Sequence, residues 1–185
     1  MRMGNIQNGR ISWDSLVYTD KPEEIVKYEL GYDDVLFNRT NSAEHVGKSG
    51  IFKSDRHAIF AGYLIRLHLK RDRILPDFMN YYLNSRPARE HGRRVMSQSV
   101  HQANINGTKL RAYPITVPAI EEQKRIVDEL YMLERESQQL QDVYGNKLAF
   151  LSQLRQSLLQ KAFAGELTAE SASLAPKSTG AAANE

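Results

Sequence analysis

The chain has 185 residues, of which 41% are hydrophobic, and it carries a net charge of +3. This length allows one domain with its own core and an appendage. The sequence has no cysteine, which excludes a disulfide framework and a thiolate metal site and fits a reducing compartment. It shows no apolar signal-peptide run at its start, and no stretch approaches the roughly 18 apolar residues of a membrane span, so we expect a cytoplasmic protein with no membrane partner.

The charge is distributed unevenly along the chain. Residues 1–116 contain 18 Lys and Arg against 12 Asp and Glu, a net +6, whereas residues 117–185 contain 7 against 10, a net −3. One stretch, residues 85–111, holds six basic side chains and only Glu90 as an acid: Arg86, Arg89, Arg93, Arg94, Lys109 and Arg111. Such an excess could neutralise nucleic-acid phosphates, and the alternative on charge alone is an ordinary solvated surface.

The first 116 residues are predicted to mix strands and helices. Asn8-Gly9 and Asn106-Gly107 are turn dipeptides that suit tight hairpins, so each should separate two strands. Residues 34–37, Asp-Val-Leu-Phe, indicate a short buried strand. A longer strand is predicted for residues 58–70, where Ile65, Leu67 and Leu69 alternate with Arg66, His68 and Lys70.

Two further segments precede the last third of the chain. Residues 76–83 predict a helix, because proline is tolerated in a first turn and Phe78, Tyr81, Tyr82 and Leu83 supply an apolar stripe. That stripe is typical of a core contact. Residues 112–118 predict an extended segment, since each of its two prolines pushes its predecessor out of the helical region.

Residues 118–167 predict one long helix, on the order of 65 Å at about 1.5 Å per residue. It ends near Gly165, where a left-handed cap would lie. Gly145-Asn146 is a weak point at which the helix could bend or break. Eight of eleven positions in a heptad seam are apolar, which predicts a coiled coil: Ile126, Leu130, Leu133, Leu140, Tyr144, Leu151, Leu154 and Leu158. Residues 168–185 are small and polar, and we expect them to be disordered.

Sequence signatures of catalysis are absent. The chain contains no Walker-type phosphate loop, no Gly-x-Gly-x-x-Gly, no Gly-x-Ser-x-Gly and no His-Glu-x-x-His motif. It also has no Asn-Pro-Pro-Tyr or Asp-Pro-Pro-Tyr motif, which holds the target base in amino-methyltransferases. The five histidines have no metal-ligand spacing. We therefore expect a chain that is not an enzyme and that binds no metal or cofactor itself.

Two polar segments carry groups suited to DNA. Residues 38–42, Asn-Arg-Thr-Asn-Ser, follow an apolar strand directly, and residues 97–106 are rich in amides. Arginine can bond guanine and asparagine adenine bidentately, while serine and threonine contact phosphates or bases. The alternative is a pair of polar turns whose side chains satisfy their own backbone.

Four segments together resemble the DNA-specificity subunit of type I restriction-modification enzymes. The first three are Arg-Met-Gly-Asn-Ile at 2–6, Val-Leu-Phe-Asn-Arg-Thr-Asn-Ser at 35–42 with Val-Gly-Lys at 46–48, and Gln-Ala-Asn-Ile-Asn at 102–106. The fourth runs from Pro-Ile-Thr-Val-Pro at 114–118 through Glu-Gln-Lys-Arg-Ile-Val at 122–127 to a Phe-Ala-Gly-Glu-Leu end at 163–167. The order and spacing of these segments make the resemblance specific.

The resemblance implies an α+β fold: a mixed α/β target-recognition domain at 1–117, followed by a long coiled-coil-forming helical spacer at 118–167. A full family subunit has two recognition domains and two antiparallel helices, and each domain reads one half of a split site on double-stranded DNA. With one of each, this chain is expected to form a homodimer, or to be a fragment of a longer reading frame. The resemblance also implies that type I modification (methyltransferase) and restriction subunits are partners, which bind S-adenosylmethionine, ATP and Mg.

For the DNA contacts, the resemblance points to Asn38, Arg39, Thr40 and Asn41, with Lys48, Gln102 and Asn104 as further candidates. Two departures accompany it. Family members have additional sequence before the segment matching residues 2–6, so we expect this chain to lack an opening strand or loop. Asp33-Asp34 stands where the family has Gly-Asp, which removes a glycine that would permit an unusual turn. The competing hypothesis is a coiled-coil interaction protein whose basic domain binds protein or RNA.

Overall fold

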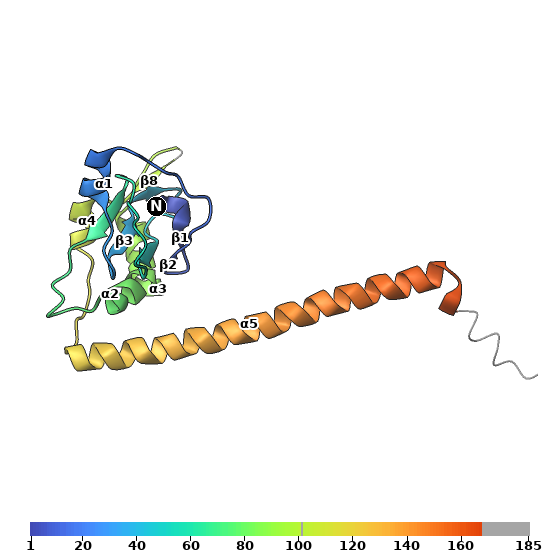
Figure 1. The fold of residues 1–185 in the computed structure, drawn as a ribbon. Coiled ribbons are helices and arrows are strands. Elements are labelled where there is room, and N and C mark those ends of the chain that lie inside the picture. The colour runs from blue at the N-terminus through green and yellow to red at the C-terminus, as the bar shows by residue number, and fades with distance from the viewer. Residues whose placement is uncertain (101, 168–185) are drawn as a thin grey trace, which may run out of the picture. The chain divides into compact units, whose positions relative to one another are not determined.

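The structure is a computed structural model that describes residues 1–100 and 102–167 (Figure 1). The chain divides into two compact units, Met1–Tyr131 and Met132–Glu185. The first unit contains two sheets and several short helices, and a long helix follows. This arrangement confirms the predicted α+β fold class. The predicted disordered tail at 168–185 lies outside the described residues.

The chain opens with the 3₁₀ helix η1 (Met3–Asn5) and a β-hairpin of β1 (Ile6–Gln7) and β2 (Arg10–Ile11). Ile6 lies opposite Ile11 and Gln7 opposite Arg10 in an antiparallel pair. The two residues between the strands, Asn8 and Gly9, have φ angles of 48° and 75°. Positive φ at both positions is the requirement of a tight type I′ turn, so the predicted hairpin at Asn8-Gly9 is confirmed.

The main sheet has the strand order β1-β2-β5-β3-β6, with β3 (Val35–Asn38), β5 (Ser49–Ile51) and β6 (Leu64–Leu67). All four residues of β3 are buried. Val35 and Phe37 belong to one hydrophobic cluster, and Leu36 belongs to the other. The predicted buried strand is therefore confirmed, and its continuous apolar run reflects burial on both faces.

The long strand predicted for residues 58–70 is wrong in extent. Only Leu64–Leu67 forms a strand, while Ile59 makes an isolated bridge to Glu29 and a turn at Gly62 and Tyr63 separates the two. Ile65, Leu67 and Leu69 nevertheless pack against the first cluster, as their alternation predicts. Alternation identified the face that packs against the first cluster, although Leu64 on the other face is buried in the second cluster. Alternation could not show where the turn interrupts the ladder.

Three short helices begin with proline in the first turn: α1 (Pro22–Tyr28), α2 (Pro76–Asn84) and α3 (Arg86–Val95). The helix predicted at 76–83 is confirmed, although only Leu83 of its apolar stripe is buried and the three aromatic residues are half-buried. Polar contacts also hold α2 to the sheet. Asn80 Nδ2 donates to Gly9 O at 2.8 Å, and Asn84 Nδ2 donates to Ser49 Oγ at 2.7 Å.

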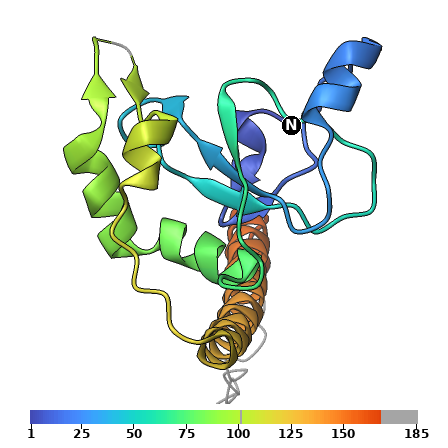
Figure 2. The same cartoon turned by 90° about the vertical axis from the view of Figure 1, so that its left-hand side faces the viewer.

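A second, three-stranded sheet has the order β4-β8-β7, with β4 (Thr40–Asn41), β7 (Ser97–Gln98) and β8 (Ala103–Asn104). Figure 2 shows α3 leading directly into this sheet, with α4 (Gly107–Arg111) beside it. The hairpin turn predicted at Asn106-Gly107 is wrong. Asn106 is instead the N-cap of α4, where its Oδ1 accepts from Lys109 N at 2.9 Å, because asparagine suits both roles.

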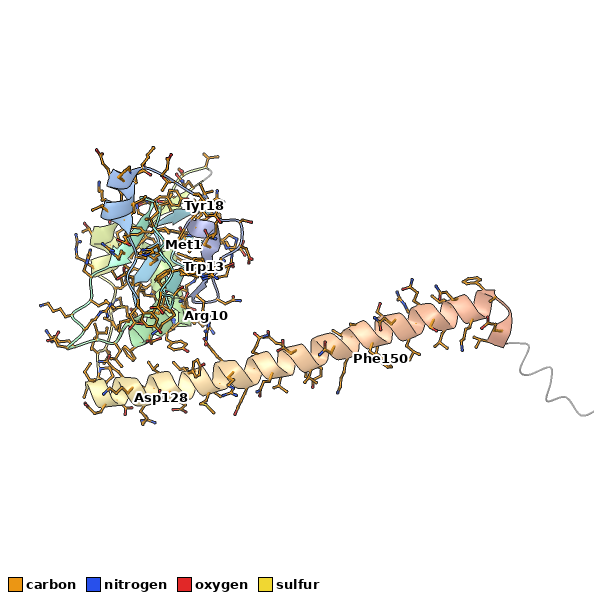
Figure 3. The ribbon with its side chains drawn as sticks, in the orientation of Figure 1. Met1, Arg10, Trp13, Tyr18, Asp128 and Phe150 are labelled. Carbon is orange, nitrogen blue, oxygen red and sulfur yellow. The ribbon has the colours of Figure 1, made fainter. Side chains whose placement is uncertain are left out.

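The helix α5 (Ile120–Phe163) is 44 residues long and stays helical through Gly145 and Asn146, so the predicted long helix is confirmed without a break. Gly165 has a φ of 77°, as expected of a left-handed cap. Many large apolar side chains of α5 are exposed, including Leu140 at 58% and Phe150 at 64%. Figure 3 labels Phe150 on this helix. Within the described residues, no helix combines the length and hydropathy needed to cross a membrane.

The turn before β3 keeps an unusual backbone conformation without glycine. Asp33 has a φ of 70°, in the left-handed region. Aspartate tolerates this region better than most residues. Its backbone N donates to Phe52 O at 2.8 Å, and Lys53 Nζ pairs with its carboxylate. Asp33 therefore adopts the left-handed conformation at the position where the resemblance led us to expect a glycine.

Candidate nucleic-acid interface

The small sheet joins the two polar segments that the sequence pointed out. Strand β4, from residues 38–42, pairs antiparallel with β8, from residues 97–106. Thr40 lies opposite Asn104, and Asn41 lies opposite Ala103. In strand β7, Ser97 lies opposite Asn104. Side chains that are about sixty residues apart in the chain therefore share one surface.

Strand alternation decides which side chains face outward. Ala103 and Ile105 are fully buried in the first cluster, so Asn104 between them points to the other face. On that face Asn104 Nδ2 donates to Thr40 Oγ1 at 2.7 Å. Lys109 Nζ donates to Ser97 Oγ at 2.7 Å. We call Thr40, Asn104, Ser97 and Lys109 the polar row.

Arg39 lies on the opposite side of this sheet from Thr40. Ile105 N donates to Arg39 O at 2.8 Å and extends the pairing of β8 with β4 by one residue. Arg39 is therefore on the face of the buried Ile105. The residue is half-buried, and its Nε is enclosed without a hydrogen-bond partner among the described residues. Asn41, which lies opposite the buried Ala103, shares this inner face.

Asn38, which was predicted as a DNA contact, is fully buried. Its backbone N donates to Lys48 O at 2.8 Å, and its Nδ2 donates to His45 O at 3.3 Å. Gly47 N also donates to Asn38 O at 2.8 Å, from a glycine with a φ of 85°. Asn38 thus holds the loop of residues 42–48 in place, with half-buried Lys48 at the end of that loop.

The link between β7 and β8 carries the last candidate, Gln102. Ser99 N and Ser99 Oγ donate to Gln102 O at 2.8 and 3.0 Å. These bonds use the backbone of Gln102 and leave its exposed side chain available. Gln98 and Ser99 are exposed as well, so the hairpin presents several polar side chains to solvent.

The helix α3 adds positive charge beside the small sheet. Arg86 pairs with Glu90 at 2.7 Å, and Arg89 Nη2 donates to Glu44 O at 3.3 Å in the 42–48 loop. Burial, and then the charge of Arg93, lower the pKa of Arg89. Exposed Arg93 and Arg94 make no ion pair within the part of the chain that the structure describes.

Close packing fixes the position of α3. An added Cβ at Gly92 would lie 2.6 Å from the Tyr113 hydroxyl oxygen, so only glycine fits against this ring. The Tyr113 ring also makes edge contacts with Phe37 and His91. Burial raises the pKa of Tyr113 to about 12. The basic helix is therefore packed against Ile105, on the inner face of the small sheet.

Sequence reasoning named Asn104 and Thr40 as candidates but not Ser97 or Lys109. The signal for Ser97 was present, because antiparallel pairing across a short hairpin places it opposite Asn104. Lys109 was noted only for its charge, and its contact with Ser97 depends on α4. Across the described residues, no group of three His, Asp or Glu side chains is placed to hold a metal ion.

Comparison with known proteins agrees with this geometry. Residues 1–143 match the family model described as the Type I restriction modification DNA specificity domain. The chain belongs to this family. The match confirms the resemblance that the four segments suggested. The small sheet and α3 both lie within the matched residues.

Several curated relatives carry the same description in their names. The EcoKI specificity subunit of Escherichia coli K12 is 29% identical over 92% of this chain, and the StySPI specificity subunit of Salmonella potsdam is 34% identical over 78%. The EcoBI specificity subunit of Escherichia coli is 31% identical over 92%. All three are named as specificity subunits of type I restriction enzymes, which agrees with the prediction of a specificity subunit rather than an enzyme.

The chain spans about a third of the length of these relatives. The matched regions cover 37%, 32% and 35% of the EcoKI, StySPI and EcoBI subunits respectively. The α+β unit and the long helix of this chain thus correspond to only part of each relative.

Proposed function

We propose that this chain is the DNA-recognition and scaffold subunit of a type I restriction-modification system, and that its α+β unit reads one half of a split DNA site. The observation that carries the proposal is the small sheet, which assembles two polar segments beside a basic helix. Phosphate contacts by basic and hydroxyl side chains position a protein on DNA, and amides and arginines read base edges.

The candidate DNA contacts fall into two groups under this proposal. Thr40, Asn104 and Gln102 are polar side chains of the small sheet and its hairpin, and they face DNA directly. Arg39 and Asn41 lie on the inner face, so they contact DNA only from the edge of the sheet, as Lys48 does from the 42–48 loop. Asn38 acts as a positioning residue that shapes this loop.

The proposal extends to assembly through α5. Leu133, Leu151 and Leu158 are 56%, 57% and 48% exposed in the single chain, so the heptad seam is open to solvent from Leu133 onward. Burying such a seam against a second helix would be favourable, because apolar surface contributes about 25 cal/mol per Å² removed from water. A homodimer with an antiparallel coiled coil would hold two recognition domains a set distance apart and dock methyltransferase and restriction subunits.

A selection from random DNA duplexes tests the recognition role. The full chain, alone and with type I methyltransferase subunits, should enrich one short sequence, and structured RNA of equal length should compete poorly. Failure to enrich any duplex in either condition would refute the role in DNA recognition. Strong preference for RNA would favour the alternative of an interaction protein with a basic RNA-binding domain.

The variant Arg39→Ala sharpens this test. If Arg39 contacts a base, the substitution should weaken binding to the selected duplex by about 1–3 kcal/mol and leave binding to random duplexes nearly unchanged. Lys70→Ala is the matched control, since Lys70 is exposed and lies in the turn after β6. Equal losses on both duplexes would make Arg39 a phosphate contact instead.

A further inference from the structure

We infer that the polar row, formed by Thr40, Asn104, Ser97 and Lys109, binds the phosphate groups of a DNA backbone. This assignment rests on the proposed DNA recognition and adds a role for each member. It also gives individual roles to Ser97, which the sequence placed only within a polar segment, and to Lys109, which the sequence placed only within a basic stretch.

The hydrogen bonds within the row leave mainly donors to face a ligand. Thr40 Oγ1 accepts from Asn104 Nδ2, and Ser97 Oγ accepts from Lys109 Nζ. A hydroxyl that accepts one hydrogen bond keeps its own proton to donate elsewhere. Each of the two nitrogens also keeps at least one further N–H. Phosphate oxygens only accept hydrogen bonds, so a donor-rich row matches them better than it matches a base edge, which mixes donors and acceptors.

The backbone pairing fixes this arrangement before any ligand arrives. Thr40 and Ser97 both lie opposite Asn104, so the three side chains stand in line across adjacent strands. With strands about 4.8 Å apart, the line is roughly 10 Å long. The buried neighbours Ala103 and Ile105 keep Asn104 on this face. Little side-chain freedom is therefore lost when an anion binds.

The surrounding charge favours an anion at this surface. Lys109 ends the row, and the preceding helix α3 supplies Arg93 and Arg94, which have no ion-pair partner among the described residues. Arg111 follows in the last turn of α4. Lys109 is the cation that directly contacts the row, and the arginines of α3 and α4 add to the positive charge of this part of the unit. A cation that contacts a row of donors suits a backbone phosphate.

The experiment measures duplex affinity for the full chain and its variants over a range of salt concentrations. Lys109→Met should lower affinity equally for the selected and random duplexes, and should reduce the slope of log affinity against log salt by about 0.9. Lys70→Met, which removes the same charge from an exposed turn, should leave the slope unchanged. An unchanged slope for Lys109→Met would overturn the assignment.

The uncharged members of the row are tested by hydroxyl removal and rescue. Thr40→Val and Ser97→Ala should each weaken binding to both duplexes by about tenfold, because a hydrogen bond to a charged group is lost. Thr40→Ser, which keeps the hydroxyl, should restore most of the affinity. The control Thr116→Val alters an exposed threonine outside the sheet and should have no effect. Circular dichroism melting should confirm that each variant folds.

Three outcomes separate this inference from the proposed function. Loss confined to the selected duplex would mean that the row reads bases, which overturns the inference but supports DNA recognition. Failure of the unaltered chain to bind any duplex would instead refute the proposed function. Inorganic phosphate, compared with chloride at equal ionic strength, should compete only weakly; complete displacement at millimolar concentration would overturn the assignment to a duplex backbone.

Discussion

Gly92 shows how a single missing side chain positions the basic helix. The Tyr113 hydroxyl occupies the space that a Cβ at Gly92 would need, and Ile105 Cδ1 lies 3.3 Å from that Cβ position. Tyr113 is held in turn by edge contacts with Phe37 and His91. Because Ile105 directly follows β8, a shift at Gly92 would be transmitted to the strand that carries Asn104.

Gly92→Ala should therefore destabilise the protein, although alanine is normally better than glycine in a helix. We expect the free energy of unfolding to fall by about 1–3 kcal/mol, since overpacking outweighs the gain in helix propensity. Gly145→Ala is the control, because nothing lies within 4 Å of an added Cβ there, and it should stabilise α5 by up to about 1 kcal/mol. Urea denaturation measures both. Similar stabilisation by the two substitutions would contradict the packing argument.

The start of α5 depends on one buried amide. Gln123 is fully buried, and its Oε1 accepts from Leu75 N at 2.9 Å. Its Nε2 donates to Arg73 O at 2.9 Å and to Pro118 O at 2.8 Å. Three backbone groups from two loops thus converge on one side chain, which fastens the first turn of the helix within the first unit. The Glu-Gln helix start that supported the resemblance therefore has a structural reason.

Replacing this amide should be costly. Gln123→Ala leaves three backbone groups without their partner, and we expect the free energy of unfolding to fall by about 2–4 kcal/mol. Gln138→Ala is a matched control in the same helix, since Gln138 is exposed and its Nε2 donates to Asp142 Oδ1 at 2.9 Å. It should change stability by no more than about 0.5 kcal/mol. Equal melting temperatures for the two variants would show that the buried amide has no special role.

At the scale of the whole molecule, the exposed seam of α5 predicts association. Light scattering at micromolar concentration should give twice the mass of one chain, and Leu140→Asp should return it to a single chain by placing a charge in the seam. Ser152→Asp adds the same charge outside the seam and should leave the dimer intact. A monomer from the unaltered chain would exclude the homodimer, although DNA recognition would survive.

Catalysis is predicted to need further subunits. The sequence has no base-holding motif of amino-methyltransferases, so the purified chain should transfer no labelled methyl group from S-adenosylmethionine to DNA. Adding type I methyltransferase subunits should restore transfer at the selected site. Incorporation of label by the chain alone would contradict the scaffold role.

Several features of this protein followed from residue patterns alone, because their causes are local. Asn8-Gly9 forms a turn since both residues accept positive φ. The continuous apolar run of β3 predicted its burial, and the persistent apolar repeat of α5 predicted one long helix. The family resemblance likewise needed only the order of short segments. The same local reasoning failed at Asn106, which was predicted to lie in a hairpin turn but is the N-cap of α4. Asparagine is favoured at both kinds of position, so the residue type alone could not distinguish them.

Tertiary structure alone decided which of the polar residues share a surface. Residues 38–42 form one stretch of sequence, yet strand alternation separates Thr40 from Arg39 and burial encloses Asn38. Thr40 instead meets Asn104 and Ser97 through strand pairing across about sixty residues. Side-chain direction depends on register and on which face is buried, and both are set by long-range packing. The sequence by itself identified the polar residues, and the fold determined which of them share one surface.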